Sequence, residues 1–110
     1  MTGDKPINID DAEFEEVVLK EEGVSVVDFW APWCGPCHSM APSLEAFTKA
    51  NVGRVKVFKL DVDDHPKTAE KYEIKSVPTV IFFKNGVQAD KVLGAMSESA
   101  LQGKLDALLS

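Results

Sequence analysis

The stretch VSVVDFWAPWCGPC, from Val24 to Cys37, decides the fold that this sequence predicts. Its first part, Val24 to Ala31, is apolar at nearly every position and starts with β-branched side chains. Such a run is typical of a central strand buried on both faces, so helices must cover the sheet on either side. From Gly35 onward the apolar residues instead recur at helical spacing. A buried strand therefore leads into a helix at the two cysteines.

Cys34 and Cys37 occupy the junction between this strand and this helix. Unpaired backbone N–H groups and the helix macrodipole favour negative charge at a helix N-terminus. We therefore expect the pKa of the Cys34 thiol to lie below its ordinary value of about 8.5. Cys37 lies one turn further in and is expected to be more buried and less reactive. The pattern predicts that Cys34 forms a mixed disulfide with a substrate and that Cys37 then resolves it.

Two other interpretations of a Cys-x-x-Cys pair are half of a zinc site and an inert structural disulfide. Zinc requires four ligands, and the sequence has no second such pair. The histidines are His38 and His65, and His38 adjoins Cys37 in a poor geometry for a shared metal. We therefore expect no metal site. A secreted, disulfide-stapled domain would also show four or more cysteines.

The rest of the sequence predicts a single α/β domain over residues 1–110, with a central mixed five-stranded sheet flanked by four helices. Its first half contains an edge strand at 6–9, a helix capped by Asp10 or Asp11 that carries Phe14, Val17 and Val18 and stops near Gly23, and a helix with Met40, Leu44 and Phe47. Its second half contains a strand at 54–60, a short helix opened by Asp64, His65 and Pro66, a hairpin around Asn85-Gly86, and a helix capped by Ser97 with Leu101, Leu105 and Leu108.

Three motifs together resemble the thioredoxin family: FWAPWCGPC at 29–37, Ser-Val-Pro-Thr at 76–79, and Asn85-Gly86. The resemblance runs from about Ile7 to Leu109. It implies a thioredoxin fold and a general protein-disulfide reductase that is regenerated by a flavin- and NADPH-dependent thioredoxin reductase. The chain has no Gly-rich dinucleotide fingerprint, so we expect no bound cofactor and electrons supplied by that partner.

The same resemblance implies roles for residues around the cysteines. Pro78 matches the proline that follows a cis peptide bond and faces the disulfide, which would leave the Val77 backbone free to pair with a substrate strand. The flat, apolar substrate surface would comprise Trp33, Gly35, Pro36, Val77, Pro78, Leu93, Gly94 and Ala95.

Several tryptophan and surface positions carry expectations of their own. Trp30 is expected to face the core against the active-site helix. Leu93 stands where the family often has a smaller β-branched residue. His38 replaces the usual Lys or Arg after the second cysteine. It either makes the reaction weakly pH-dependent near neutrality or is a harmless exposed residue.

Asp28 is a carboxylate inside the apolar run VVDFW. Loss of hydration there should raise its pKa. It could instead face water at a sheet edge or pair with Lys59 on the neighbouring strand. The resemblance implies that Asp28 lies beneath Cys37 and assists its proton transfer, with Lys59 as the partner of the carboxylate.

The charge balance of 12 basic and 18 acidic residues gives a net charge of -6. This disfavours sequence-independent binding to nucleic acid or an anionic membrane. The sequence shows no spanning apolar run and no secretory signal, so we expect a protein of the cytoplasm, or of an organellar matrix if a transit peptide was removed. We also expect a monomer. The acidic run of Asp61, Asp63 and Asp64 lacks the spacing of a calcium loop and is expected to be a solvated, helix-capping run.

Two alternatives to a reductase are an oxidase or isomerase of an exported compartment, and a binding module whose cysteines are incidental. The Gly35-Pro36 pair between the cysteines and the absence of an export signal disfavour the first. The intact pair of thiols disfavours the second. The expected partners are therefore thioredoxin reductase and disulfide-containing proteins.

Overall fold

A computed structural model describes residues 3–110 and confirms the predicted order of elements. The strands are β1 (Ile7–Asn8), β2 (Val24–Trp30), β3 (Val55–Asp61), β4 (Thr79–Lys84) and β5 (Val87–Leu93). The helices are α1 (Asp11–Phe14), which continues into a π-helical turn η1 (Glu15–Leu19), α2 (Gly35–Ala50), α3 (Pro66–Lys71) and α4 (Glu98–Leu109).

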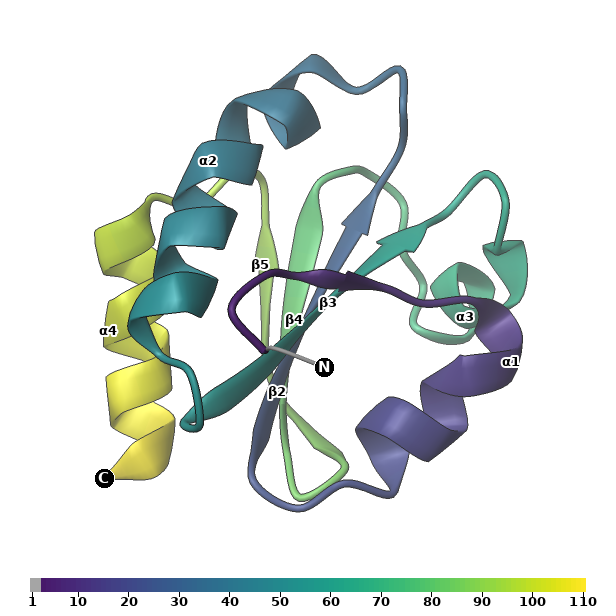
Figure 1. Cartoon of the computed structure of the whole chain (residues 1–110). Coiled ribbons are helices and arrows are strands. Elements are labelled where there is room, and N and C mark those ends of the chain that lie inside the picture. The colour runs from purple at the N-terminus through teal and green to yellow at the C-terminus, as the bar shows by residue number, and fades with distance from the viewer. Residues whose placement is uncertain (1–2) are drawn as a thin grey trace.

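The five strands form one mixed sheet in the order β1-β3-β2-β4-β5. β2 runs parallel to β3 and antiparallel to β4, so the predicted central strand has hydrogen-bonded neighbours on both sides. Helices α2 and α4 lie side by side over one face of the sheet, and α1 and α3 cover the other (Figure 1). The expected mixed five-stranded sheet between layers of helices is confirmed.

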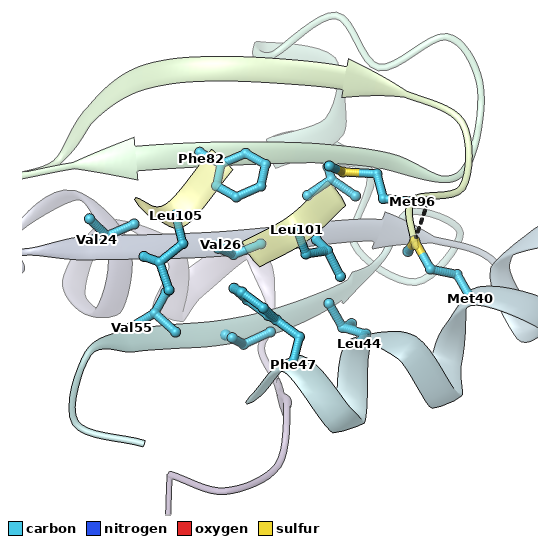
Figure 2. Packing of buried hydrophobic residues seen from close by; sticks show 12 residues of the cluster. Val24, Val26, Met40, Leu44, Phe47, Val55, Phe82, Met96, Leu101 and Leu105 are labelled. Atoms are coloured by element: carbon cyan, nitrogen blue, oxygen red, sulfur yellow. Dashed lines mark hydrogen bonds between the residues drawn. The ribbon is translucent and has the colours of Figure 1, made fainter. Parts of the chain in front are cut away.

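β2 is buried on both faces because it supplies alternate side chains to two separate cores. Val24 and Val26 join the core under α2 and α4, whereas Val27 and Phe29 join the core under α1 and α3. Figure 2 shows the first of these cores, in which side chains from both helices meet the sheet. Its buried members are Val24, Val26, Met40, Leu44, Phe47, Val55, Val57, Val80, Phe82, Met96, Leu101 and Leu105.

The strand directions bring four chain segments to one end of the sheet. The parallel pair β2 and β3 both end there, at Trp30 and Asp61. β4 begins there, because Thr79 pairs with Phe29, and β5 ends there, because Leu93 pairs with Thr79. The loops after β2, β3 and β5 and the loop before β4 therefore meet at this end, near the top of Figure 1.

The structure shows which of the two candidate residues caps the first helix. Asp10, not Asp11, caps α1, and the Glu13 side chain completes a capping box. Asp11 instead accepts hydrogen bonds from the backbone N–H groups of Lys67 (3.1 Å) and Thr68 (2.8 Å). It therefore caps α3 from a distant part of the chain.

Gly23 does not end the first helix, which stops at Leu19. It has a positive φ of 84° in the turn before β2. There its N–H donates to Asn85 Oδ1 at 2.7 Å, and its carbonyl accepts the Asn85 N–H at 2.8 Å. The β4–β5 hairpin, predicted from Asn85-Gly86, is thus tied to the start of the central strand.

Gly86 has a φ of 80°, and a Cβ atom there would collide with the carbonyl of Leu19. We expect Gly86→Ala to lower the free energy of unfolding by at least about 2 kcal/mol, because it adds a backbone clash to an unfavourable φ. Gly103→Ala is the matched control, since it lies inside α4 with no atom near its added methyl group. That change should raise stability by about 0.5–1 kcal/mol. Urea denaturation measures both, and equal effects of the two substitutions would contradict this view of the hairpin.

Candidate active site

Cys34 is the N-cap residue of α2, as the sequence predicted. Its backbone is extended, and its Sγ accepts the backbone N–H of Cys37 at 3.1 Å. Cys34 and Cys37 form a disulfide with their Cα atoms 5.3 Å apart. A helix N–H that donates to Cys34 Sγ in this way favours negative charge on that sulfur once the disulfide is reduced.

The expectation that Cys37 is the more buried cysteine is wrong. Their exposed fractions are 3% for Cys34 and 4% for Cys37. Val77 packs against the two cysteines and places its carbonyl oxygen 3.6 Å from Cys34 Sγ. Cys34 and Cys37 therefore differ in their position on α2 and not in their exposed fraction.

The loop before β4 faces the disulfide in the expected conformation. The Val77–Pro78 peptide bond is cis. The Pro78 carbonyl accepts the Gly94 N–H at 2.9 Å, and Thr79 Oγ1 donates to the Ser76 carbonyl at 2.7 Å. These bonds fix the loop between the start of α2 and the end of β5.

The structure gathers the predicted surface residues at the same end of the sheet. Trp33 is 71% exposed and Leu93 is 67% exposed, so large apolar groups face outward near the disulfide. A hydrogen bond holds the Trp33 side chain in this position, because its Nε1–H donates to Asp63 Oδ2 at 2.8 Å. The remaining members are exposed (Gly35, Pro36, Ala95), half-buried (Val77, Gly94) or buried (Pro78).

Asp63 belongs to the acidic run, whose residues Asp63 and Asp64 are exposed as expected. Asp61 Oδ1 accepts the backbone N–H groups of Asp63 (2.9 Å) and Asp64 (3.5 Å), which closes the turn after β3. The run does not cap α3, a task that Asp11 performs. Only the tertiary structure reveals that this turn holds Trp33.

Trp30 and His38 form a contact beside the cysteines. Trp30 is half-buried, and its ring meets the His38 ring edge-on with centroids 6.2 Å apart. His38 is exposed, yet its Nε2 lies 2.7 Å from the Pro32 carbonyl oxygen. The expected packing of Trp30 against the active-site helix is confirmed, with His38 as its partner on that helix.

Asp28 is a buried carboxylate, only 2% exposed, and its Oδ1 has no hydrogen-bond partner among residues 3–110. Burial raises its pKa from 3.8 to about 7, and the charge of Lys59 partly opposes the rise. Lys59 is its register partner on β3 and places its ammonium 4.4 Å from the centroid of the Trp30 ring. Asp28 shares the face of β2 that α2 covers, so it does not point to water at a sheet edge.

Residues 3–110 contain no group of three or more His, Cys, Asp or Glu side chains arranged to hold a metal ion. In the same part of the chain, no helix is both long enough and apolar enough to cross a membrane.

The family model for thioredoxin matches residues 5–107. The chain belongs to the thioredoxin family. It is 47% identical over 100 residues to thioredoxin of Staphylococcus aureus, covering 91% of this chain and 94% of that one. It is 45% identical over 101 residues to thioredoxin of Synechocystis sp., covering 92% and 94% of the two chains.

A chloroplastic M-type thioredoxin of Pisum sativum is 45% identical over 98 residues, which are 89% of this chain. The chain spans 57% of the length of that relative. A mutant thioredoxin from Halobacterium salinarum NRC-1 superposes with a TM-score of 0.89 at 30% identity, covering 100% of this chain and 96% of that one. The thioredoxin fold is thereby confirmed. Thioredoxins are protein-disulfide oxidoreductases, and this chain carries the Cys34–Cys37 disulfide at the start of α2.

We expect Asp28→Asn to stabilise the protein in a pH-dependent way. The folded-state pKa of about 7 lies above the ordinary 3.8, so ionising Asp28 costs folding free energy. The cost is absent below about pH 4, grows as the pH rises and is complete above about pH 7, where it is on the order of a few kcal/mol. Urea denaturation of both proteins from about pH 4 to pH 8 should therefore show a widening gap.

The matched control for that series is Asp64→Asn, which removes an exposed carboxylate from a turn. Its stability relative to the parent protein should not change with pH in this way. A constant difference between Asp28→Asn and the parent protein across the range would mean that Asp28 ionises at its ordinary pKa.

Proposed function

We propose that the chain is a general protein-disulfide reductase that acts as a single thioredoxin domain and is regenerated by an NADPH-dependent thioredoxin reductase. The observation that carries the proposal is the position of Cys34 Sγ, which accepts a helix N–H next to the Val77–Pro78 loop. Identity with thioredoxins over nine-tenths of the chain supports it.

The first step is attack of the Cys34 thiolate on one sulfur of a substrate disulfide. The substrate S–S bond breaks and a new S–S bond joins Cys34 to the substrate. The other substrate sulfur leaves as a thiolate and takes up a proton from water. The helix N–H that now contacts Cys34 Sγ favours the thiolate from which this attack starts.

The second step requires Cys37 to lose its proton and attack Cys34 Sγ. The Cys34–substrate bond then breaks, the second substrate thiolate leaves, and the internal disulfide forms. In this proposal Asp28 accepts the Cys37 proton. A carboxylate with a pKa of about 7 can take up and release a proton near neutral pH. Lys59 favours the ionised form of Asp28 that serves as the base.

Substrate contact is proposed for the surface around Trp33 and Leu93. Both side chains are exposed and apolar, and such a patch suits extended protein segments rather than a small molecule. In this proposal the backbone of Val77 pairs with such a segment as an added strand, and the hydrogen bonds of Pro78 and Thr79 that hold its loop support that role. A flat patch of this kind fits a broad range of substrates.

We also propose that the protein acts as a monomer in a reducing compartment, where its disulfide can be turned over. That compartment is the cytoplasm or an organellar matrix. The chloroplastic relatives are compatible with the organellar option. The proposed partners are thioredoxin reductase and proteins that carry disulfides.

The direct test is reduction of insulin disulfides by NADPH and a thioredoxin reductase, with and without this protein. We expect turnover that depends on the protein and falls to background in Cys34→Ser, because the nucleophile is lost. Cys37→Ser should instead trap a covalent adduct with the substrate, visible by mass spectrometry. Full turnover in Cys34→Ser, or the absence of any adduct with Cys37→Ser, would contradict these roles.

We expect Asp28→Asn to slow the second step by about 10²-fold, because it removes a positioned base. In single turnovers of the reduced protein, the mixed disulfide should accumulate. In the parent protein the rate of this step should rise through about pH 7 as Asp28 ionises, and the variant should lack that rise. Identical rates of resolution in the two proteins from about pH 6 to pH 8 would remove Asp28 from the mechanism.

A further inference from the structure

His38 contacts both sides of the turn that joins β2 to α2. Its Nε2 lies 2.7 Å from the carbonyl oxygen of Pro32, inside the turn. Its ring meets the ring of Trp30, the last residue of β2, at an interplanar angle of 80°. A side chain that follows Cys37 on the helix is thus anchored to the segment that precedes Cys34.

The chemistry of the bond settles the direction of donation. A carbonyl oxygen accepts only, so Nε2 must carry a proton, and this assigns the tautomer of a neutral His38 ring. The imidazolium form also carries a proton on Nε2. The bond to Pro32 therefore does not depend on a positive charge on the His38 ring.

The bond closes a loop around both cysteines. Two backbone bonds accompany it: the Cys34 N–H donates to the Ala31 carbonyl at 3.1 Å, and the His38 N–H donates to the Cys34 carbonyl at 3.3 Å. In the oxidised protein the disulfide itself also joins the turn to the helix. In the dithiol form that covalent link is gone, so the side-chain bond of His38 carries a larger share of the restraint.

We propose that His38 is a positioning residue that holds the turn before Cys34 against α2 in the dithiol form. It keeps Cys34 Sγ at the helix N-terminus, within reach of the Cys37 N–H that stabilises the thiolate. Without this restraint the turn samples other conformations, and Cys34 spends less time in its reactive position. The inference rests on the proposed function, since it concerns the state that attacks substrate.

Three substitutions separate this role from the alternatives. His38→Ala removes the donor and the ring. His38→Gln removes the ring and any charge but keeps an amide N–H at a similar reach. Ser39→Ala is the matched control, because Ser39 Oγ donates to the Gly35 carbonyl at 3.2 Å within the same helical turn and does not reach the segment before Cys34.

The measurements are the rate at which iodoacetamide alkylates Cys34 in the reduced protein, and the dithiol–disulfide equilibrium against glutathione. We expect His38→Ala to slow alkylation about 3- to 10-fold and to shift the equilibrium toward the disulfide by a similar factor, as for one net hydrogen bond. His38→Gln should restore most of the parent protein's alkylation rate and most of its dithiol–disulfide equilibrium constant. Ser39→Ala should stay within about twofold of the parent protein.

Two results would overturn the proposal. Equal loss of unfolding free energy in the oxidised and reduced forms of His38→Ala, with alkylation and equilibrium unchanged, would assign His38 a general structural role. A His38→Gln protein as impaired as His38→Ala would assign the effect to ring or charge. If His38→Ala does not fold, His38→Asn replaces it, because its shorter amide cannot reach Pro32. Neither measurement uses a protein substrate, so failure of the reductase assay remains a separate outcome.

Discussion

The burial of β2 between two hydrogen-bonded neighbours is the constraint on which the rest of this structure depends. β3 and β4 satisfy its backbone groups on either side, while its side chains supply a separate core on each face of the sheet. A strand in that position needs apolar residues along its whole length, and this requirement is met from Val24 to Phe29 at every position except Ser25 and Asp28. The end of β2 is consequently held in place by its pairing with β3 and β4. The turn that carries Cys34 starts from it, and the start of β4 and the end of β5 are held in register beside it.

Asp28 is the position at which this strand departs from the apolar pattern at a cost in stability. A carboxylate in the middle of a two-sided core loses its hydration, and the neighbouring charge of Lys59 offsets only part of that loss. A Val or Ile in its place would satisfy the pattern of the strand better. The Asp28 carboxyl is instead a titratable group that changes charge near neutral pH on the face of the sheet that α2 covers. Local departures from a folding rule of this kind are expected at functional sites.

At the end of the sheet that carries the Cys34–Cys37 disulfide, hydrogen bonds hold the surrounding segments in place. Backbone and side-chain bonds hold the Val77–Pro78 loop, the turn at Asp61 and the Trp33 indole, each from a different segment of the chain. Exposed apolar groups can therefore stay in place without being buried. Under the proposed function, this arrangement would limit the entropy lost when an extended substrate segment binds, since little of the surface must be ordered. The bond from Trp33 to Asp63 also explains how a large apolar side chain stays exposed to solvent in a small domain.

The sequence by itself determined the elements and the reacting sulfurs, because these depend on short-range rules. Periodicity marked β2 and α2, Asn85-Gly86 marked the hairpin, Ser97 marked the start of α4, and the spacing of Cys34 and Cys37 marked the redox pair. Tertiary structure alone decided which distant groups meet. Asp11 caps α3, Asp63 holds Trp33, His38 bonds to Pro32, and Val77 covers Cys34 so that the two cysteines are equally buried. The reason is physical: polar side chains on turns have many possible partners along the chain, and only the packing of the sheet against its helices brings one of them within hydrogen-bond distance.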